Sequence, residues 1–360
     1  MTIVAHTHAY VVGVDTHART HTFAILVAAT GELVTTEQFP STRAGMDRAI
    51  AWAARRTDGD LATLWVIEGV ATYGARLAAT VSRAGYDVVE AARMEARAHR
   101  GTGKSDPLDA RRIAAAVLSL EPPQLRHPRS DDGIRAALRI LLASREHMTT
   151  ERTATINALT ALLRVVDLGI DARTPPTAKQ VNEVARWRAR VEDLATITAR
   201  AEAVRLAKRV ADLDKELAAN QAQMIDLIHS SKAAVLLDKP GIGPVTVAVV
   251  LAAWSHAGRV RSEAAFAALA GVNPIPASSG NTTRHRLNRG GDRRLNRALH
   301  MAVVTRMTHH PETRAYVERR RAEGRTTKEI RRSLKRYLAR QLYRTLNALH
   351  HQPKPEPQTT

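Results

Sequence analysis

The chain has 360 residues, which is long enough for two or three domains with hydrophobic cores. Its 54 lysines and arginines outnumber its 35 aspartates and glutamates, and the resulting formal net charge of +19 predicts a polyanionic partner such as nucleic acid. Cysteine is absent from the sequence, which excludes disulfides, thiolate metal sites and a cysteine nucleophile.

The sequence of the N-terminal third of the chain predicts a mixed α/β fold. Short β-branched runs and a turn at Gly31 predict a three-stranded meander. A further apolar strand, a helix and another strand then predict β-α-β alternation, so we expect a mixed sheet with helices. The expected strands cover residues 10–15, 22–28, 32–39, 64–68 and 86–90, and the expected helix covers residues 72–84.

Two acidic residues close predicted strands in this region. Asp15 ends the first strand and Glu68 ends the fourth. Open α/β sheets usually place their functional sites at the carboxyl ends of strands. The alternative is that an acid at such a position only helps to form the turn after the strand, and this alternative applies to both Asp15 and Glu68.

A second pair of acids lies at the start of a predicted helix. Pro107 is typical of the first turn of a helix, so we expect a helix that is capped by Asp106 and runs to about residue 118. Side chains three residues apart share a helical face, so Asp106 and Asp109 can converge on one point. Together with the strand acids they could hold two divalent cations, magnesium or manganese, for a phosphoryl transfer. The alternative is an N-cap and a solvated acid.

Four histidines near the first strand, His6, His8, His17 and His21, could suggest zinc. Strand alternation would place only every second one on a given face. We therefore expect them to be surface residues.

The middle of the chain predicts long helices. Apolar residues recur at helical intervals over residues 131–163, which predicts a helical hairpin or one long helix, and residues 174–177 break it. A charged helical stretch then runs to about His229 and carries an apolar seam with a slip near residues 201–205, which is typical of a coiled coil with a stutter. Either a dimer or an antiparallel pair within one chain satisfies this pattern. The seam consists of Val184, Trp187, Val191, Leu194, Val210, Leu213, Leu217, Met224 and Leu227.

The C-terminal third contains a glycine turn between two predicted helices. The run from Pro240 to Pro244 resembles a helix-hairpin-helix module, in which the amides of Gly241 and Gly243 would approach DNA phosphates. A tight interhelical turn without a ligand is the alternative.

The strongest positive charge follows this turn. Residues 281–340 hold 18 basic and five acidic side chains, so +13 of the net +19 lies there. Aromatic residues make up only 4% of the chain, so base stacking is not the expected mode of binding. The candidate nucleic-acid-binding arginines are Arg284, Arg286, Arg289, Arg293 and Arg294.

A non-helical loop over residues 275–280 precedes these arginines. Its hydroxyl groups, Ser278 and Ser279, are candidate nucleophiles for a phosphodiester, because the surrounding arginines would hold the phosphate. A solvated surface hydroxyl is the alternative. The final residues, 351–360, have the composition of a disordered tail.

The segments VGVDTH, VIEGVATYG and KSDPLDARRIA resemble the Asp-Glu-Asp-Asp signature of DEDD transposases, the insertion-sequence one-ten family, which includes a site-specific DNA invertase. The later segments PGIGPVTVAVVLAAW and GVNPIPASSGNTTRHRLNRGGDRRLNRALHMA resemble the second domain of that family. The resemblance implies a RuvC-like domain of the RNase H superfamily at residues 8–125, a helical coiled-coil region at 130–230 and a mainly α-helical transposase domain at 231–348.

The resemblance also implies roles for individual residues. Asp15, Glu68, Asp106 and Asp109 would be the metal ligands, and Ser279 would form a covalent phosphoserine link with DNA, with the adjacent Ser278 as the alternative. Family members act with a structured guide RNA and assemble through the coiled coil, so a dimer or tetramer is expected.

The hypothesis from the sequence is therefore a recombinase that cuts and rejoins DNA at the ends of an insertion element, with a composite site of the acids and Ser279. A metal-dependent junction endonuclease that uses water, and a noncatalytic nucleic-acid-binding scaffold, are the alternatives. Because no apolar run approaches the roughly 18 to 20 residues of a membrane span and no signal pattern is present, we expect a soluble cytoplasmic, nucleoid-associated protein.

Overall fold

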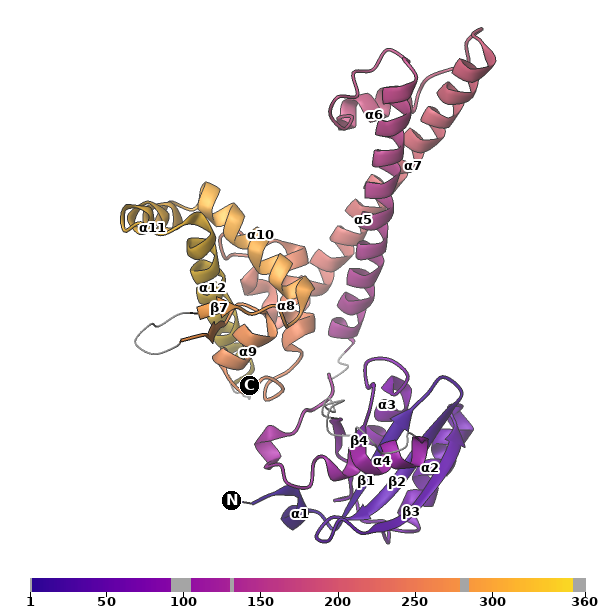
Figure 1. Cartoon of the computed structure of the whole chain (residues 1–360), viewed down its shortest axis with the longest axis vertical. Coiled ribbons are helices and arrows are strands. Elements are labelled where there is room, and N and C mark those ends of the chain that lie inside the picture. The colour runs from indigo at the N-terminus through magenta and orange to yellow at the C-terminus, as the bar shows by residue number, and fades with distance from the viewer. Residues whose placement is uncertain (1, 92–104, 130–132, 279–284, 352–360) are drawn as a thin grey trace, which may run out of the picture. The chain divides into compact units, whose positions relative to one another are not determined.

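The computed structural model describes residues 2–91, 105–129, 133–278 and 285–351. The chain forms two compact units, Met1–Ser130 and Asp131–Thr360. The first carries the main sheet, and the second consists mainly of helices (Figure 1). Within the described ranges, no helix combines the length and apolar character that crossing a membrane requires.

The first unit is built on a five-stranded mixed sheet of order β3-β2-β1-β4-β5. Strands β1, β2 and β3 pair antiparallel, whereas β4 pairs parallel with β1 and β5 pairs parallel with β4. This topology confirms the predicted meander followed by β-α-β alternation. The strands are β1 Tyr10–Thr16, β2 Thr20–Val27, β3 Leu33–Pro40, β4 Leu64–Ile67 and β5 Val88–Glu90.

Helices cover both faces of this sheet. One core contains Phe23 and Trp65 and packs under α2 (Arg43–Ala54) and α3 (Ala75–Arg83). Of these two helices, α3 was predicted from the sequence and α2 was not. The other core lies under α4 (Asp106–Ala115) and the short α1 (Val4–Thr7). The central strands β1 and β4 are thus buried on both faces, which explains their continuous apolar runs.

Helix α4 lies unusually close to β1 because Gly13 has no side chain. A Cβ atom at Gly13 would lie 2.2 Å from the carbonyl oxygen of Ala110 and 2.5 Å from the amide nitrogen of Ala114. The helix backbone therefore rests directly on the strand that carries Asp15. This contact brings the first turn of α4 to the carboxyl end of β1.

The start of α4 differs from the prediction in one respect. Pro107 lies in the first turn as expected, but the N-cap residue is Ser105, so the prediction that Asp106 caps the helix was wrong. A capping side chain folds back onto the amides of its own helix. As the first helical residue, Asp106 instead directs its carboxylate toward His17.

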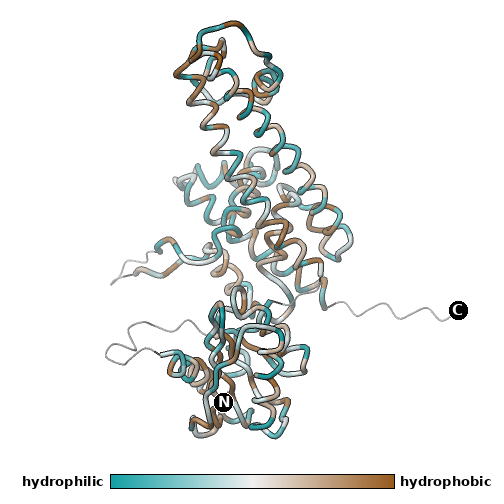
Figure 2. Tube along the Cα trace, turned by 90° about the vertical axis from the view of Figure 1, so that its right-hand side faces the viewer, coloured by the Kyte–Doolittle hydropathy of each residue, from teal (hydrophilic) through white to brown (hydrophobic). Residues whose placement is uncertain are grey.

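The second unit begins with two long helices that pack against each other. Helix α5 (Ile134–Val165) is one continuous helix, and α7 (Leu194–His229) returns alongside it. Asn220 donates a hydrogen bond to the carbonyl of Leu141. Further along, Arg209 pairs with Glu151, so the two helices run antiparallel. The sequence left open a dimer or an antiparallel pair within one chain, and this chain contains the antiparallel pair. Hydrophobic and hydrophilic residues alternate along both helices (Figure 2).

The predicted apolar seam is interrupted between these helices. The short α6 (Ala178–Val184) ends at the first seam residue, and Val191 and Leu194 are exposed. The prediction of one helical seam from Val184 onward was therefore wrong. Its physical cause is Asp193, whose side chain accepts hydrogen bonds from the amides of Ala195 and Thr196 and starts α7 as a new helix.

The C-terminal helices share one core with the base of the helical pair. Leu138 of α5 and Ile228 of α7 belong to the same buried cluster as Trp254. A two-stranded sheet of β6 (Pro274–Pro276) and β7 (His285–Leu287) was not predicted. The helices of this region are η3 Lys232–Leu236, α8 Pro244–Trp254, α9 Glu263–Leu269, α10 Arg293–His309, α11 Pro311–Ala322 and α12 Thr327–His351.

Candidate active site

The candidate site of the first unit begins with Asp15 near the end of β1. The residue is buried, with 6% of its surface exposed. Its Oδ2 atom lies 3.2 Å from Nε2 of His17, two residues further along the chain. The same His17 nitrogen lies 3.6 Å from Oδ1 of Asp106 in α4.

These three residues form a compact group of potential ligands. One donor atom from each of Asp15, His17 and Asp106 lies within 4.8 Å of the other two. His17 was expected to be an ordinary surface residue. Although half of its side chain is exposed, the imidazole faces both carboxylates. Its position two residues after Asp15 was the signal, because side chains at i and i+2 of an extended chain point to the same side.

Glu68 approaches the same group from the end of β4. Its amide nitrogen donates to the carbonyl of Val14 at 3.0 Å, and its own carbonyl accepts from Oγ1 of Thr16 at 3.0 Å. These bonds fix the backbone of Glu68 beside the end of β1. Although the residue is exposed, desolvation by its surroundings raises the pKa of its carboxyl group, and the charge of Asp15, a hydrogen bond with Asp15 and the charge of Asp109 raise it further.

Asp109 lies one helical turn after Asp106. Its Oδ1 atom accepts a hydrogen bond from Arg112 at 3.0 Å, and its side chain is only 16% exposed. Arg112 was not identified from the sequence, although the spacing of three residues on a helix was a sufficient signal for this pair. The guanidinium partly balances the charge of Asp109.

The arrangement fits a divalent cation. Carboxylate oxygens are the ligands that magnesium and manganese prefer, and the carboxylates outnumber the single imidazole of the group. Besides desolvation, the charges of neighbouring carboxylates raise the pKa of Glu68, and this mutual repulsion is the condition that a bound cation relieves. The structure thus brings Asp15, Glu68, Asp106 and Asp109 to one edge of the sheet.

His21 differs from the other histidines near β1. It is 1% exposed, so the prediction that it is a surface residue was wrong. It stands opposite Thr16 in the register of β1 and β2, where the sheet is covered, and burial lowers the pKa of its imidazole. His6 is exposed and His8 is partly exposed, in agreement with the prediction for those two residues.

The candidate phosphate-binding glycines of the second unit lie in different environments. Gly241 has a φ of +69°, and a Cβ there would lie 2.7 Å from the carbonyl oxygen of Ala302 in α10. Close packing against α10 therefore explains this glycine without a ligand. Gly243 precedes α8 and is exposed, and a Cβ added to it would meet no atom of the described residues within 4 Å.

The candidate arginines are spread over the hairpin and α10. Arg286 on β7, Arg289 after it and Arg293 at the start of α10 are all exposed. Arg284 and Ser279 lie outside the described residues. Ser278 is exposed and follows β6.

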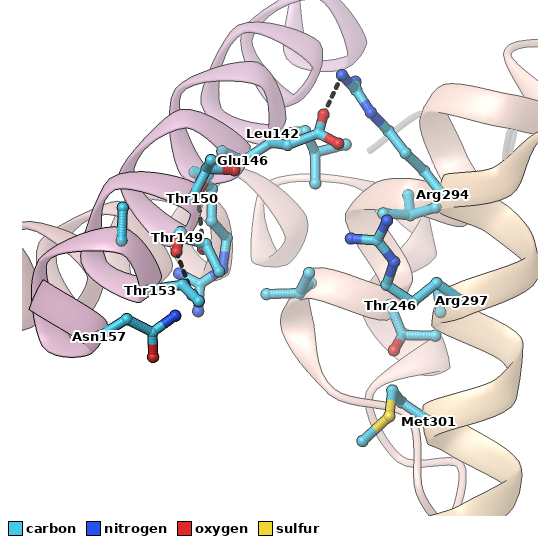
Figure 3. A pocket seen from close by; sticks show the side chains of 15 residues that line it. Leu142, Glu146, Thr149, Thr150, Thr153, Asn157, Thr246, Arg294, Arg297 and Met301 are labelled. Atoms are coloured by element: carbon cyan, nitrogen blue, oxygen red, sulfur yellow. Dashed lines mark hydrogen bonds and ion pairs between the residues drawn. The ribbon is translucent and has the colours of Figure 1, made fainter. Parts of the chain in front are cut away.

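Arg294 lines a groove of about 820 Å³ between α5, α8 and α10 (Figure 3). Its guanidinium forms an ion pair with Glu146 of α5 across the groove. The α5 wall carries hydroxyl groups, including Thr149 and Thr153, whereas Met301 contributes an apolar part of the α10 wall. A phosphate at Arg294 would have to compete with the carboxylate of Glu146.

Two family models match the chain. Residues 12–166 match a DEDD model named for IS110 and described as Transposase. Residues 233–318 match a model described as the Transposase IS116/IS110/IS902 family. The first match contains all four acids, and the second contains the glycine turn and the candidate arginines between residues 284 and 294.

Individual proteins are similar over most of the chain. The 42 kDa protein of insertion element IS900 from Mycobacterium paratuberculosis is 28% identical over 363 residues, which covers 87% of this chain and 89% of that protein. The 44.8 kDa protein of insertion element IS116 from Streptomyces clavuligerus is 26% identical over 367 residues, with coverage of 87% and 88%. The 43.6 kDa protein of insertion element IS110 from Streptomyces coelicolor is 28% identical over 270 residues, with coverage of 63% and 66%.

Proposed function

Because this chain belongs to the IS110 family of DEDD transposases, we propose that it cuts and rejoins DNA at the ends of an insertion element by metal-assisted, serine-linked phosphodiester transfer. Membership of this family implies that the chain is an enzyme that acts on DNA and uses a divalent metal. The proposal adds which residues carry the reaction and by what chemistry.

One observation carries the proposal for the first unit. Acids from two strands and one helix, far apart in the sequence, lie at one edge of the sheet, where Asp15 and Asp106 share His17. At the same edge, desolvation and then the charges of Asp15 and Asp109 raise the pKa of Glu68. Acids that served only as turn formers or helix caps would have no reason to face one another. The five-stranded mixed sheet beneath them is consistent with an RNase H-like domain.

The chain's own residues divide the work at this site. Asp15, Glu68, Asp106 and Asp109 would hold the divalent cations, and Arg112 keeps Asp109 in place. When bound, such ions stabilise the charges that develop on the attacking and leaving oxygens. The buried Asp15 is held in the sheet, so the site is positioned by backbone rather than by flexible loops.

The proposed nucleophile is Ser279, with Ser278 as the alternative. Its Oγ would form a bond to phosphorus while the bond from phosphorus to the departing strand's oxygen breaks. The hydroxyl proton passes to solvent and the departing oxygen takes up a proton. A phosphoserine link to DNA results, and attack by a second strand's hydroxyl would reverse the step on new DNA and restore the serine.

Strand cleavage by purified protein tests the role of the acids. Asp15→Ala is expected to abolish magnesium-dependent strand breakage, because the buried ligand is lost. Asp47→Asn, which removes an exposed acid of α2, is the matched control and should cleave normally. Normal cleavage by the Asp15 variant, with its fold intact by circular dichroism, would show that the reaction does not depend on Asp15. Absence of cleavage by the unaltered protein would leave only a noncatalytic scaffold.

A protein–DNA adduct that survives denaturing electrophoresis tests the serine. Ser279→Ala should abolish the adduct, and Ser278→Ala should retain it. The reverse result would move the nucleophile by one residue. Cleavage without an adduct in the unaltered protein would favour a nuclease that uses water.

A structured guide RNA and a homo-oligomer complete the proposal. Both rest on the family resemblance, and exposed apolar residues on the long helices, such as Ile140 and Val165, support self-association. Sequencing of RNA that co-purifies with the protein and sedimentation analysis test them. Recovery of no discrete RNA species, or a monomer at all concentrations, would contradict the respective part.

A further inference from the structure

A small cleft lies between the β6–β7 hairpin and α12 in the second unit. Its volume is about 150 Å³. The hairpin side includes Asn273 and Arg286, and the α12 side includes Arg332, Lys335 and Arg336. We call this space the hairpin cleft.

The hairpin cleft is lined by positive charge. Residues 332, 335 and 336 are spaced so that their side chains share one face of α12. Arg286 adds a fourth cation from β7, and none of the described residues that line the cleft is acidic. Four like charges around one small space repel one another, so an anion placed there gains from all of them.

Lys335 is the member of this group that is most constrained. Its Nζ donates a 3.0 Å hydrogen bond to Oδ1 of Asn296. The amide group of Asn296 is fixed in turn, since its Nδ2 donates to the carbonyl of Ala270 at 2.7 Å. Burial, followed by the charge of Arg332, lowers the pKa of Lys335. The ammonium group is therefore held in position by a neutral amide rather than by a carboxylate.

The backbone beneath the cleft is tightly packed. Gly271 has a φ of +63°, and a Cβ there would lie 2.6 Å from the carbonyl oxygen of Gly290. This contact joins the segment before β6 to the segment after β7. Asn288 reinforces the join by donating a 2.6 Å hydrogen bond to Asn273. The cleft is consequently a preformed feature of the hairpin base.

The hairpin connects the cleft to the serine pair through the chain. Ile275 of β6 pairs with Arg286 of β7 at the cleft. Ser278 follows the end of β6 by two residues, and Ser279 is next in sequence. A group held at the hairpin base is therefore only a few residues from the candidate nucleophile.

We propose that the hairpin cleft binds a backbone phosphate of the DNA strand that is presented to the serine loop, with Lys335 as the positioning residue. The choice of DNA rests on the proposed function. Contacts to phosphate carry no base information, so this site fixes the position of the strand and is independent of its sequence. Arginines 286, 332 and 336 supply further donors to the same phosphate or its neighbours.

The salt dependence of binding tests the cleft directly. Lys335→Gln removes the charge but keeps an amide donor for Asn296, and Lys328→Gln removes the same charge from an exposed position on the same helix outside the cleft. Fluorescence anisotropy would follow binding of full-length protein to a short DNA duplex of arbitrary sequence over roughly 50 to 200 mM salt. The slope to be compared is that of the logarithm of the association constant against the logarithm of the salt concentration. We expect its magnitude to fall by about one for Lys335→Gln and to change less for Lys328→Gln.

Several results would overturn the inference. A Lys335→Gln slope equal to that of the unaltered protein, or an equal effect of Lys328→Gln, would show that the cleft makes no specific phosphate contact. A reduced slope with an RNA of the same length but not with DNA would overturn the assignment to DNA. Thermal unfolding of both variants checks that the fold is retained, and Arg332→Gln, at an exposed residue, provides a second variant with the same expected slope change.

Failure of the serine chemistry is distinguishable from failure of the cleft. Ser279→Ala should leave the salt slope unchanged because it removes no charge. If the unaltered protein forms no adduct but Lys335→Gln still reduces the slope, the serine role fails and the cleft stands. If the adduct forms normally and Lys335→Gln changes neither the slope nor the adduct yield, the cleft fails and the serine role stands.

Discussion

Substitution of Gly13 by alanine should damage both catalysis and stability. The added Cβ would lie 2.2 Å from the carbonyl oxygen of Ala110, whereas ordinary contact begins at 3.4 Å, so α4 has to move by about 1.2 Å. Overpacking of this kind costs about 1–3 kcal/mol in the free energy of unfolding. Because α4 carries Asp106 and Asp109, the same shift separates them from Asp15, and a displacement of about 1 Å at a reacting site lowers the rate by about 100-fold.

Magnesium-dependent strand cleavage by the folded Gly13→Ala protein measures this effect, and urea unfolding measures its stability. Ile25→Val is the matched control, since it destabilises the opposite face of the same sheet by about 0.5–1.5 kcal/mol without touching α4. We expect near-normal cleavage from Ile25→Val. Normal cleavage and unchanged stability in Gly13→Ala would refute the close contact between α4 and β1.

Three further changes test other parts of the fold. Asp193→Ala should lower the free energy of unfolding by about 0.5–2 kcal/mol in urea titrations, because the amides at the start of α7 lose their acceptor. Leu138→Ala should cost about 2–5 kcal/mol in the free energy of unfolding, whereas Ser144→Ala, at an exposed position of the same helix, should change it by no more than about 0.5 kcal/mol. Hydrogen bonds from Arg344 and then Arg340 lower the pKa of Glu263 from 4.5 to about 2, so its stabilising contribution is present above pH 4.5 and is lost as the pH falls toward 2. Glu263→Gln should therefore lower the thermal midpoint at pH 7 but converge with the unaltered protein in acid.

The strands of the first unit follow from local sequence patterns. β-Branched runs between turn residues place β1, β2 and β4 within one or two residues of their observed bounds. The acids at the ends of β1 and β4 were likewise visible, because strand ends are marked by the change from apolar to charged residues. Helix α2 was missed, since its apolar positions, such as Met46 and Trp52, are widely separated by polar and small residues.

In the helical middle of the chain, the repeat of apolar residues did not predict where one helix ends and the next begins. Val191 and Leu194 fit the repeat of the apolar seam, but both are exposed. Periodicity describes which residues would share a face if the helix continued. It does not detect a new start, which in this chain is set by hydrogen bonds from the amides of α7 to Asp193.

The sequence alone determined the basic charge, the α/β and helical segments, and the identity of the four acids, because these depend on composition and on patterns within a few residues. Tertiary structure decided that α4 rests on Gly13, that His17 lies between Asp15 and Asp106, and that three cations of α12 meet Arg286 around one cleft. Each of these is a contact between residues far apart in the chain. Such contacts arise from the packing of whole elements, which local patterns do not encode.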